Sequence, residues 1–187
     1  SRKMVDLMKS RLKTREMMFI ALFSALTSVS SYIIVPLPFS PVPITAQTLI
    51  VMLAGSTLTP RSAFLSMLVF LFLGICGLPV FSGGQSGIGA LLGPTGGYIL
   101  SWPIATFIMA FLLERLKPNF RSMLFVNIIG GIIIIYTIGV LYLSLIAGIG
   151  LLQAFTIGAL PFIPGDLAKV VLSSTIALSL RKTVFYK

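Results

Sequence analysis

Histidine is absent from the 187-residue sequence, cysteine occurs once, and only 4 residues are acidic. Histidine is the side chain that most often acts as a general base or binds a metal near neutral pH, so both roles lose their commonest candidate. The lone cysteine, Cys76, cannot form a disulfide within the chain. Three of the acidic residues stand among basic residues outside the apolar runs, which leaves no carboxylate cluster for a metal ion. These absences argue against an enzyme.

A phosphate-binding loop is also missing. The motif G-x-x-x-x-G-K-[ST] needs a Gly-Lys pair, because the lysine contacts the phosphates, and the sequence contains no such pair. The glycine-rich run 87–93 resembles a dinucleotide-binding fingerprint, but it has one residue too many between its glycines and no later acidic partner. We therefore expect that the chain does not hydrolyse nucleotides by itself.

Charge of either sign is scarce. Charged residues make up 10% of the sequence and hydrophobic residues 57%, whereas soluble domains carry roughly 25% charge. A soluble domain of this length leaves about 30% of its unfolded-chain surface exposed to water, and 18 charged residues could barely cover that surface. The composition therefore predicts an integral membrane protein.

Long apolar runs predict the fold. A membrane-spanning helix needs roughly 20 apolar residues, with a range of about 17–25. Six runs approach or reach this length: 17–35, 44–58, 62–77, 96–113, 122–147 and 160–180. We predict an all-α, polytopic membrane protein with six transmembrane helices. It forms one transmembrane domain, 1–187, in which a basic segment, 1–16, precedes a six-helix core, 17–180.

The basic residues predict the orientation of these helices, because cytoplasmic loops carry an excess of Lys and Arg. Thirteen of the 14 basic residues fall in four segments on one predicted side: 1–16, 59–61, 114–121 and 181–187. The loops on the other side contain no charged residue: 36–43, 78–95 and 148–159. We therefore expect both termini on the cytoplasmic side of the cell membrane. The formal net charge of +10 then records topology and does not indicate nucleic-acid binding.

The N-terminal segment has two open readings. A secretory signal peptide would carry an apolar core of 7–15 residues and a small-x-small cleavage site, whereas the first apolar run here is about 19 residues long and no clean site follows it. A retained first span is favoured. The basic stretch 2–15 either lies as a helix on anionic lipid or forms a solvated tail.

Two charged residues stand inside an apolar run. Asp166 and Lys169 are three residues apart and so share a helix face, and Ser173 continues that face. A charge at mid-membrane costs roughly 2.5–3.5 kcal/mol, so such residues face a partner or a cavity. The pair either locks helix packing or binds a ligand. We favour a ligand with a neutral polar head, because Pro164 and Gly165 open the helix near the outer surface, where free N–H groups are expected.

Two uncharged outer loops could surround such a ligand. The loop 36–43 holds four prolines, whose fixed φ makes a semi-rigid segment and one wall of a mouth. The stretch 77–97 holds eight of the 17 glycines and is either a flexible connector or a lid. Its apolar residues favour the lid.

Four polar or aromatic side chains near the outer side allow more than one interpretation or none that points to a ligand. Gln47 is an embedded amide that bonds either a ligand or another helix. Tyr142 either stacks on a flat ligand or anchors the helix at the interface, where tyrosine is common. Tyr98 and Trp102 are interpreted as interfacial residues.

Taken together, these motifs resemble the BioY family, the biotin-specific substrate-capture components (S-components) of energy-coupling factor (ECF) transporters. The resemblance runs from about residue 17 to 180 and is carried by four motifs: Val42-Pro43-Ile-Thr45-Ala-Gln47-Thr48, Gly77-Leu-Pro-Val-Phe81-Ser-Gly83-Gly84, Gly93-Pro-Thr-Gly96-Gly97-Tyr98 and Pro164-Gly165-Asp166-x-x-Lys169. It implies the six-helix S-component fold, biotin captured from outside as ligand, and no cofactor. The implied partners are a membrane coupling subunit and two cytoplasmic ATPase subunits.

The resemblance also implies a set of functional residues. The ureido head of biotin would donate to Asp166 and accept from Lys169, and backbone N–H groups of 82–84 would hold its carboxylate. The substrate-binding residues expected are Asp166, Lys169, Gln47, Tyr142, Phe81, Ser82, Gly83, Gly84 and Tyr98. Ala21 and Ala25, a pair with small-xxx-small spacing, would dock the coupling subunit.

Two other functions remain as alternatives. A self-sufficient secondary transporter or channel is disfavoured because the spans hold no chain of titratable groups, and no inverted repeat relates 17–77 to 96–180. A membrane assembly factor without a ligand is disfavoured by Asp166 and Lys169 and by the glycine-rich loop.

Overall fold

Long helices dominate the computed structural model of the chain, which describes residues 2–185, with side chains for 13–184. The principal helices are α1 (Arg2–Ser30), α2 (Gln47–Thr57), α3 (Pro60–Ile75), α5 (Gly96–Arg115), α6 (Phe120–Ile128), α7 (Ile135–Ala147) and α9 (Ile163–Leu180). The shorter elements are β1 (Ile34–Val35), β2 (Ile44–Thr45), η1 (Ser82–Gly84), α4 (Ile88–Leu91), η2 (Ile129–Ile134), α8 (Leu151–Gly158) and η3 (Arg181–Phe185).

Each of the six predicted apolar runs contains a helix, and the prediction of a helical protein is confirmed. The end of the run 17–35 and the start of the run 44–58 form β1 and β2 instead. Three continuous helices of the described chain are long and apolar enough to cross a membrane: Gly96–Arg115, Phe120–Ala147 and Ile163–Val184. The apolar helices α2 and α3 are shorter, at 11 and 16 residues. The predicted boundary between 16 and 17 lies within α1, whose backbone is helical on both sides of it. The side chains of most of the basic stretch 2–15 lie outside the described residues.

Glycines allow the central helices to approach closely. Helix α5 packs against α7 through two reciprocal contacts, in which the ring of Tyr98 lies on Gly139 and Tyr142 lies on Gly97. A Cβ atom at either glycine would overlap the tyrosine. These contacts hold the side chain of Tyr98 in the interior of the bundle.

A π-helical turn, η2, joins α6 to α7 in one continuous helix. Its Gly130 and Gly131 lie directly against the side chains of Met109 and Met52. A π turn contains one more residue than an α-helical turn and is frequent near functional sites. Here it precedes Tyr136, whose side chain reaches α9.

The buried side-chain amide of Asn127 connects α6 to α2 and α9. Oδ1 of Asn127 on α6 accepts hydrogen bonds from Ser56 on α2 at 2.9 Å and Ser173 on α9 at 3.4 Å. Its Nδ2 donates to Ser174 at 3.1 Å and to the carbonyl of Met123 at 2.9 Å. Ser173 therefore serves helix packing, although it shares a helix face with Asp166 and Lys169.

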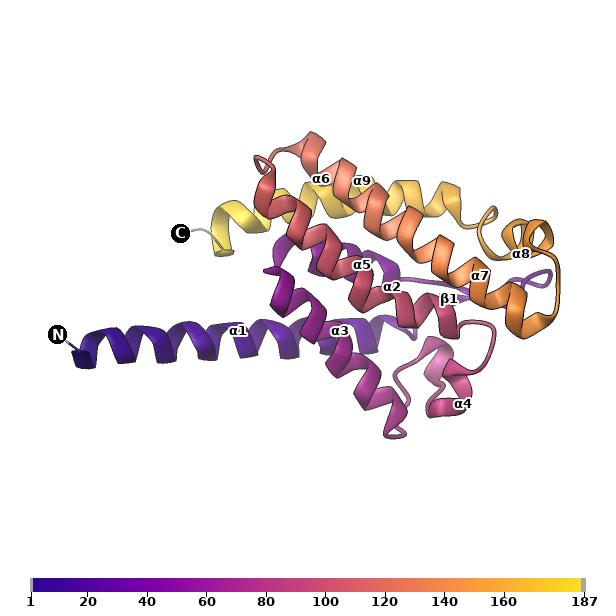
Figure 1. The fold of residues 1–187 in the computed structure, drawn as a ribbon, viewed down its shortest axis with the longest axis horizontal. Helices are drawn as coiled ribbons and strands as arrows, with labels where there is room; N and C mark the ends of the chain where they lie inside the picture. The colour runs from indigo at the N-terminus through magenta and orange to yellow at the C-terminus, as the bar shows by residue number, and fades with distance from the viewer. Residues whose placement is uncertain (1, 186–187) are drawn as a thin grey trace.

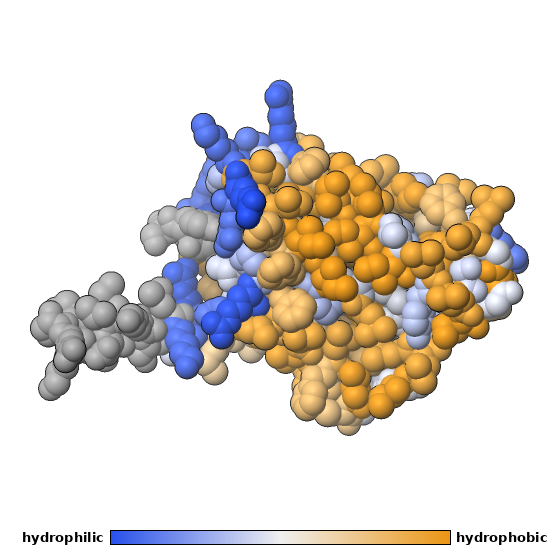
Figure 2. Space-filling model, in the orientation of Figure 1, coloured by the Kyte–Doolittle hydropathy of each residue, from blue (hydrophilic) through white to orange (hydrophobic). Residues whose placement is uncertain are grey.

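Hydrophilic and hydrophobic side chains occupy different parts of the surface. The start of α1, the connection between α5 and α6 and the end of α9 lie at the same end of the molecule (Figure 1). Hydrophilic side chains gather at this end, while hydrophobic ones cover most of the remaining visible face (Figure 2). Exposed leucines such as Leu145 and Leu152, each 81% exposed, belong to the apolar surface. A surface of this kind is expected to face lipid.

Candidate functional site

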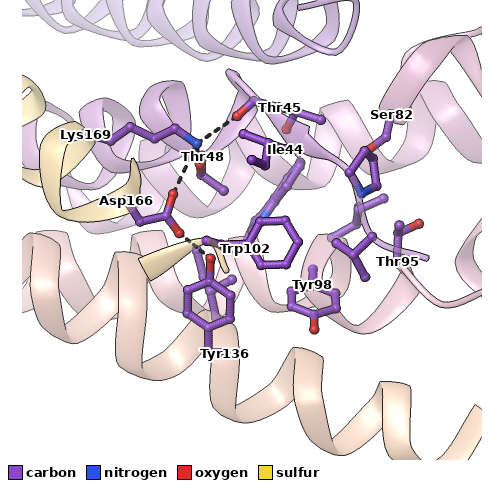
Figure 3. Close-up of a pocket in the computed structure, with 15 residues that line it drawn as sticks. Ile44, Thr45, Thr48, Ser82, Thr95, Tyr98, Trp102, Tyr136, Asp166 and Lys169 are labelled. Carbon is purple, nitrogen blue, oxygen red and sulfur yellow. Dashed lines mark hydrogen bonds and ion pairs between the residues drawn. The ribbon is translucent and has the colours of Figure 1, made fainter. Parts of the chain in front are cut away.

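Asp166 and Lys169 form the centre of a polar cluster inside the bundle (Figure 3). Asp166 is 3% exposed, and its Oδ1 lies 3.1 Å from Nζ of Lys169. Nζ also donates to the carbonyl oxygen of Thr45 and to Oγ1 of Thr48, both at 2.8 Å. An ammonium group has three N–H donors, so each donor of Lys169 has an acceptor. The predicted proximity of the two charges is confirmed.

A third group completes the cluster. The hydroxyl of Tyr136, on α7, donates a hydrogen bond to Oδ2 of Asp166. The ring of Tyr136 stacks on Phe162 with centroids 6.5 Å apart and meets Tyr98 edge-on at 6.1 Å. Both carboxylate oxygens of Asp166 therefore accept one hydrogen bond from the protein. A carboxylate offers about four acceptor positions, so Asp166 can accept further donors from a ligand.

Local structure explains how Thr45 reaches Lys169. The proline-rich loop 36–43 connects β1 to β2, which pair in antiparallel fashion with Ile34 opposite Thr45. This short ladder turns the chain back toward the bundle immediately before α2. The carbonyl of Thr45 consequently comes from the end of β2 and the hydroxyl of Thr48 from the first turn of α2.

The start of α9 differs from the prediction of free N–H groups. The N–H of Asp166 donates to the carbonyl of Phe162 at 2.9 Å, and that of Ile163 donates to Ala159 at 3.3 Å. The preceding turn, residues 159–163, supplies these acceptors. The prediction was wrong for these two groups, because the helix continues from a turn and does not open at Pro164.

The polar cluster borders a small cavity of about 50 Å³. Its polar lining comes from Thr45, Thr48, Ser82, Thr95, Tyr98, Tyr136, Asp166 and Lys169. Its apolar lining comes from Val42, Pro43, Ile44, Ile99, Trp102, Ile135 and Phe162. The charged pair lies at one end of the cavity and Ser82 and Thr95 at the other (Figure 3). The cavity therefore has a charged end and an uncharged polar end, joined by apolar walls.

A larger cavity of about 290 Å³ adjoins the first at the uncharged end. Both are lined by Pro43, Ser82 and Thr95. The proline-rich loop and the glycine-rich loop form its opposite walls, as predicted for a mouth. Among the residues that line the two cavities, Asp166 and Lys169 alone carry a charge.

The glycine-rich loop is anchored to the bundle. Phe81 is fully buried, with its ring 5.6 Å from that of Phe70 and in contact with Gly74. The N–H of Gly83 donates to the carbonyl of Ser31, and that of Gly84 donates to Phe81. Two of the amides expected to hold a carboxylate are thus already bonded within the protein.

The predicted substrate-binding residues fall into three groups. The cavity beside the charged pair is lined by Asp166, Lys169, Ser82 and Tyr98. Gly83 lines the adjoining larger cavity, and Gly84 lines a further cavity at the glycine-rich loop. Phe81, Gln47 and Tyr142 line neither the inner cavity nor the adjoining one.

Gln47 and Tyr142 hold segments together. Nε2 of Gln47 donates to the carbonyls of Thr27 at 3.1 Å and Val80 at 3.4 Å, and its Oε1 accepts from Ser82 at 3.4 Å. The hydroxyl of Tyr142 donates to the carbonyl of Leu91 at 2.7 Å. These contacts favour the structural alternative for both side chains.

Sequence reasoning missed several residues of the cavity. Tyr136 and Phe162 gave no local signal, because their contact with Asp166 or with each other depends on tertiary packing. Trp102 was interpreted only as interfacial, and Tyr98 as interfacial until the family resemblance placed it among the substrate-binding residues. They are 3% and 6% exposed and line the cavity. The hydroxyl of Tyr98 donates to the carbonyl of Gly158 at 2.7 Å. The hydroxyl of Tyr98 is thus bonded within the protein. Because both aromatic side chains are buried, neither belongs to an interfacial belt.

Comparisons with known proteins agree with this geometry. The family model described as "BioY family" matches residues 7–185. A probable biotin transporter BioY from Bacillus subtilis (strain 168) is 44% identical over 186 residues, covering 94% of this chain and 98% of that protein. A biotin transporter BioY from Rhizobium etli is 39% identical, covering 87% of this chain and 91% of that protein.

The fold has a solved counterpart. A crystal structure of the S-component for biotin from an ECF-type ABC transporter matches with a TM-score of 0.88 and 33% sequence identity. The match covers 92% of this chain and 94% of that one.

Proposed function

The chain belongs to the BioY family, and we propose that it captures biotin from outside the cell as the S-component of an ATP-driven ECF transporter. It is a transporter subunit and not an enzyme. The observation that carries the proposal is the buried carboxylate of Asp166, which borders a cavity and has acceptor positions to spare. Biotin is the proposed ligand, and binding requires no cofactor.

In the proposed complex, an N–H of the ureido ring donates to Asp166. Lys169 and Tyr136 hold this carboxylate in place, because each donates to a different oxygen. The aromatic rings of Tyr136, Phe162 and Trp102 offer an apolar surface for the fused rings of biotin. The valerate tail would extend past Ser82 and Thr95 into the adjoining cavity.

The mouth must widen for this ligand to enter. The inner cavity of about 50 Å³ is smaller than the engineered cavity of about 150 Å³ that holds a single benzene. We propose that the proline-rich and glycine-rich loops separate to admit biotin and close over it.

We also propose that all six apolar runs cross the cell membrane, with both termini in the cytoplasm. The gathering of hydrophilic side chains at one end (Figure 2) and the basic clusters of the sequence support this orientation. Helix α2 extends for only about 16 Å at about 1.5 Å per residue, which is less than the roughly 30 Å hydrocarbon core. Its flanking segments would complete the crossing.

Coupling to ATP requires partners, which we propose to be a membrane coupling subunit and two cytoplasmic ATPase subunits. Ala21 and Ala25 are both exposed on α1, one helical turn apart, while Phe23, Ser24 and Thr27 face the bundle. Small exposed residues at this spacing permit another helix to approach closely. They are the proposed docking surface for the coupling subunit.

Uptake into reconstituted vesicles tests this function. We expect vesicles that contain the chain together with the coupling and ATPase subunits to accumulate labelled biotin only when ATP is supplied to the ATPases. Vesicles that contain the chain alone should bind biotin without accumulating it. Accumulation by the chain alone, driven by an ion gradient, would instead support the self-sufficient transporter.

A further inference from the structure

The indole N–H of Trp102 has no hydrogen-bond acceptor among the residues that the structure describes. The side chain is 3% exposed and lines the inner cavity. Buried donors in folded proteins are almost always bonded, so an unpaired one calls for an explanation. A donor on a side chain that lines a binding cavity is explained if its acceptor belongs to the ligand.

The indole is held in place by its neighbours. Its ring packs against Phe70 with centroids 5.5 Å apart and planes tilted by 33°, and Phe70 in turn packs edge-on against Phe81 at 5.6 Å. Both phenylalanines are fully buried. Because this aromatic stack fills the space behind it, the indole cannot rotate freely to find an acceptor elsewhere. Its N–H is therefore an oriented donor.

The charged and phenolic donors of the cavity are already engaged. Lys169 uses its N–H groups on Asp166, Thr45 and Thr48. The hydroxyls of Tyr136 and Tyr98 donate to Asp166 and Gly158. A ligand with an acceptor atom must therefore displace one of these bonds, use the indole, or use the hydroxyl of Thr48 or Thr95, which also line the cavity.

We propose that Trp102 donates its indole N–H to the ureido carbonyl oxygen of bound biotin. This inference rests on the proposed function and changes the assignment of the carbonyl, which the family resemblance gave to Lys169. In a ureido group the carbonyl lies between the two N–H groups, so a ligand that donates to Asp166 presents its carbonyl within the same small cavity. Asp166 then accepts from an N–H of the ureido ring, and Trp102 donates to the carbonyl oxygen of the same ring. Lys169 holds Asp166 and Thr48 in place.

The composition of the chain provides a direct probe, because Trp102 is its single tryptophan. Protein labelled with ¹⁵N at the indole gives one indole N–H resonance in detergent or nanodiscs. We expect biotin to move the indole proton downfield, as hydrogen-bond formation does. The analogue 2-thiobiotin, whose sulfur is a weaker acceptor, should produce a smaller shift. The hydroxyls of Thr48 and Thr95 also line the cavity and can donate a proton, and neither contributes to this resonance.

The matched variants are Trp102→Phe and Phe70→Leu. Trp102→Phe keeps an aromatic ring and removes the donor, so we expect about a tenfold loss of biotin affinity and a smaller difference in affinity between biotin and 2-thiobiotin. Phe70→Leu disturbs the same stack without removing a donor, and it should retain both the difference between the ligands and the downfield shift.

Two results would overturn the inference. The first is an indole proton that does not move downfield when biotin saturates the native protein. The second is a Trp102→Phe protein that distinguishes biotin from 2-thiobiotin as well as the native one does. Failure of the native protein to bind biotin at all would instead refute the proposed function, so the two failures are distinguishable.

Discussion

Tyr136 and Lys169 contact different oxygens of the Asp166 carboxylate: the hydroxyl of Tyr136 donates to Oδ2, and Nζ of Lys169 lies closest to Oδ1. The two donors come from different helices, α7 and α9, and between them they orient the carboxylate toward the cavity. This arrangement supports the proposal that the charged pair binds a ligand, because the carboxylate borders the cavity.

Tyr136→Phe removes the hydroxyl and keeps the ring on Phe162. We expect biotin affinity to fall about tenfold, since one hydrogen bond to a charged group is worth about 1.5–3 kcal/mol and the carboxylate can recover part of that from the ligand. Tyr142→Phe is the matched control, because its hydroxyl bonds Leu91 outside the inner cavity. Titration calorimetry should show affinity within about twofold of native for the control. Equal losses for both variants would contradict the assigned roles.

Lys169→Met leaves the buried carboxylate of Asp166 without its cation. Removing one partner of a buried ion pair costs about 3–5 kcal/mol, which corresponds to at least about a hundredfold in affinity if the site loses its geometry. Lys182→Met, at an exposed position near the end of the chain, changes the net charge equally and should bind as the native protein does. Binding by Lys169→Met at native strength would show that the cation has no part in the site.

Gly139→Ala places a methyl group against the ring of Tyr98. We expect this overpacking to cost about 1–3 kcal/mol and to lower the thermal unfolding midpoint in detergent. Biotin affinity should fall as well, because Tyr98 lines the cavity. Gly150→Ala is the control, since no atom lies within 4 Å of its added methyl group. An unfolding midpoint for Gly139→Ala equal to that of the control would refute the close packing of α5 on α7.

Ala25→Trp tests the docking surface on α1. The added ring would project from the exposed face of the helix, so biotin binding by the purified protein should be unchanged. Assembly with the coupling subunit and ATP-dependent uptake should be lost. Val171→Trp, on the exposed face of α9, should retain both activities. If Ala25→Trp lost binding but still assembled, the helix face would have been assigned wrongly.

Much of the fold could be predicted from the sequence, because apolar runs and basic clusters are local features. The contact between Asp166 and Lys169 was predictable for the same reason, since residues three apart on a helix are neighbours. The brevity of α2 was not, because Ile44 and Thr45, at the start of the predicted apolar run, pair with β1 instead. The choice depends on a strand that lies ten residues earlier.

The remaining site residues depend on packing between distant segments. Tyr136 lies 30 residues from Asp166 and reaches it from the helix that contains the π turn. Trp102 has the composition of an interfacial residue but lies in an aromatic stack with Phe70. Gln47 resembles a ligand-binding amide, yet it bonds the carbonyls of Thr27 and Val80. Each outcome depends on a tertiary contact that spacing alone does not encode.

The most direct test of the account is a calorimetric titration of the purified chain with biotin, without ATP or partner subunits, in parallel with its Asp166→Asn variant. Asparagine keeps the size of the side chain and removes the negative charge of the carboxylate to which Lys169 and Tyr136 donate. Glu16→Gln, which neutralises a carboxylate bonded to Ser62 at the opposite end of the bundle, is the control. We predict tight binding of one biotin by the native and control proteins and a loss of at least about a hundredfold for Asp166→Asn. No binding by the native protein, or equal binding by all three, would contradict the account.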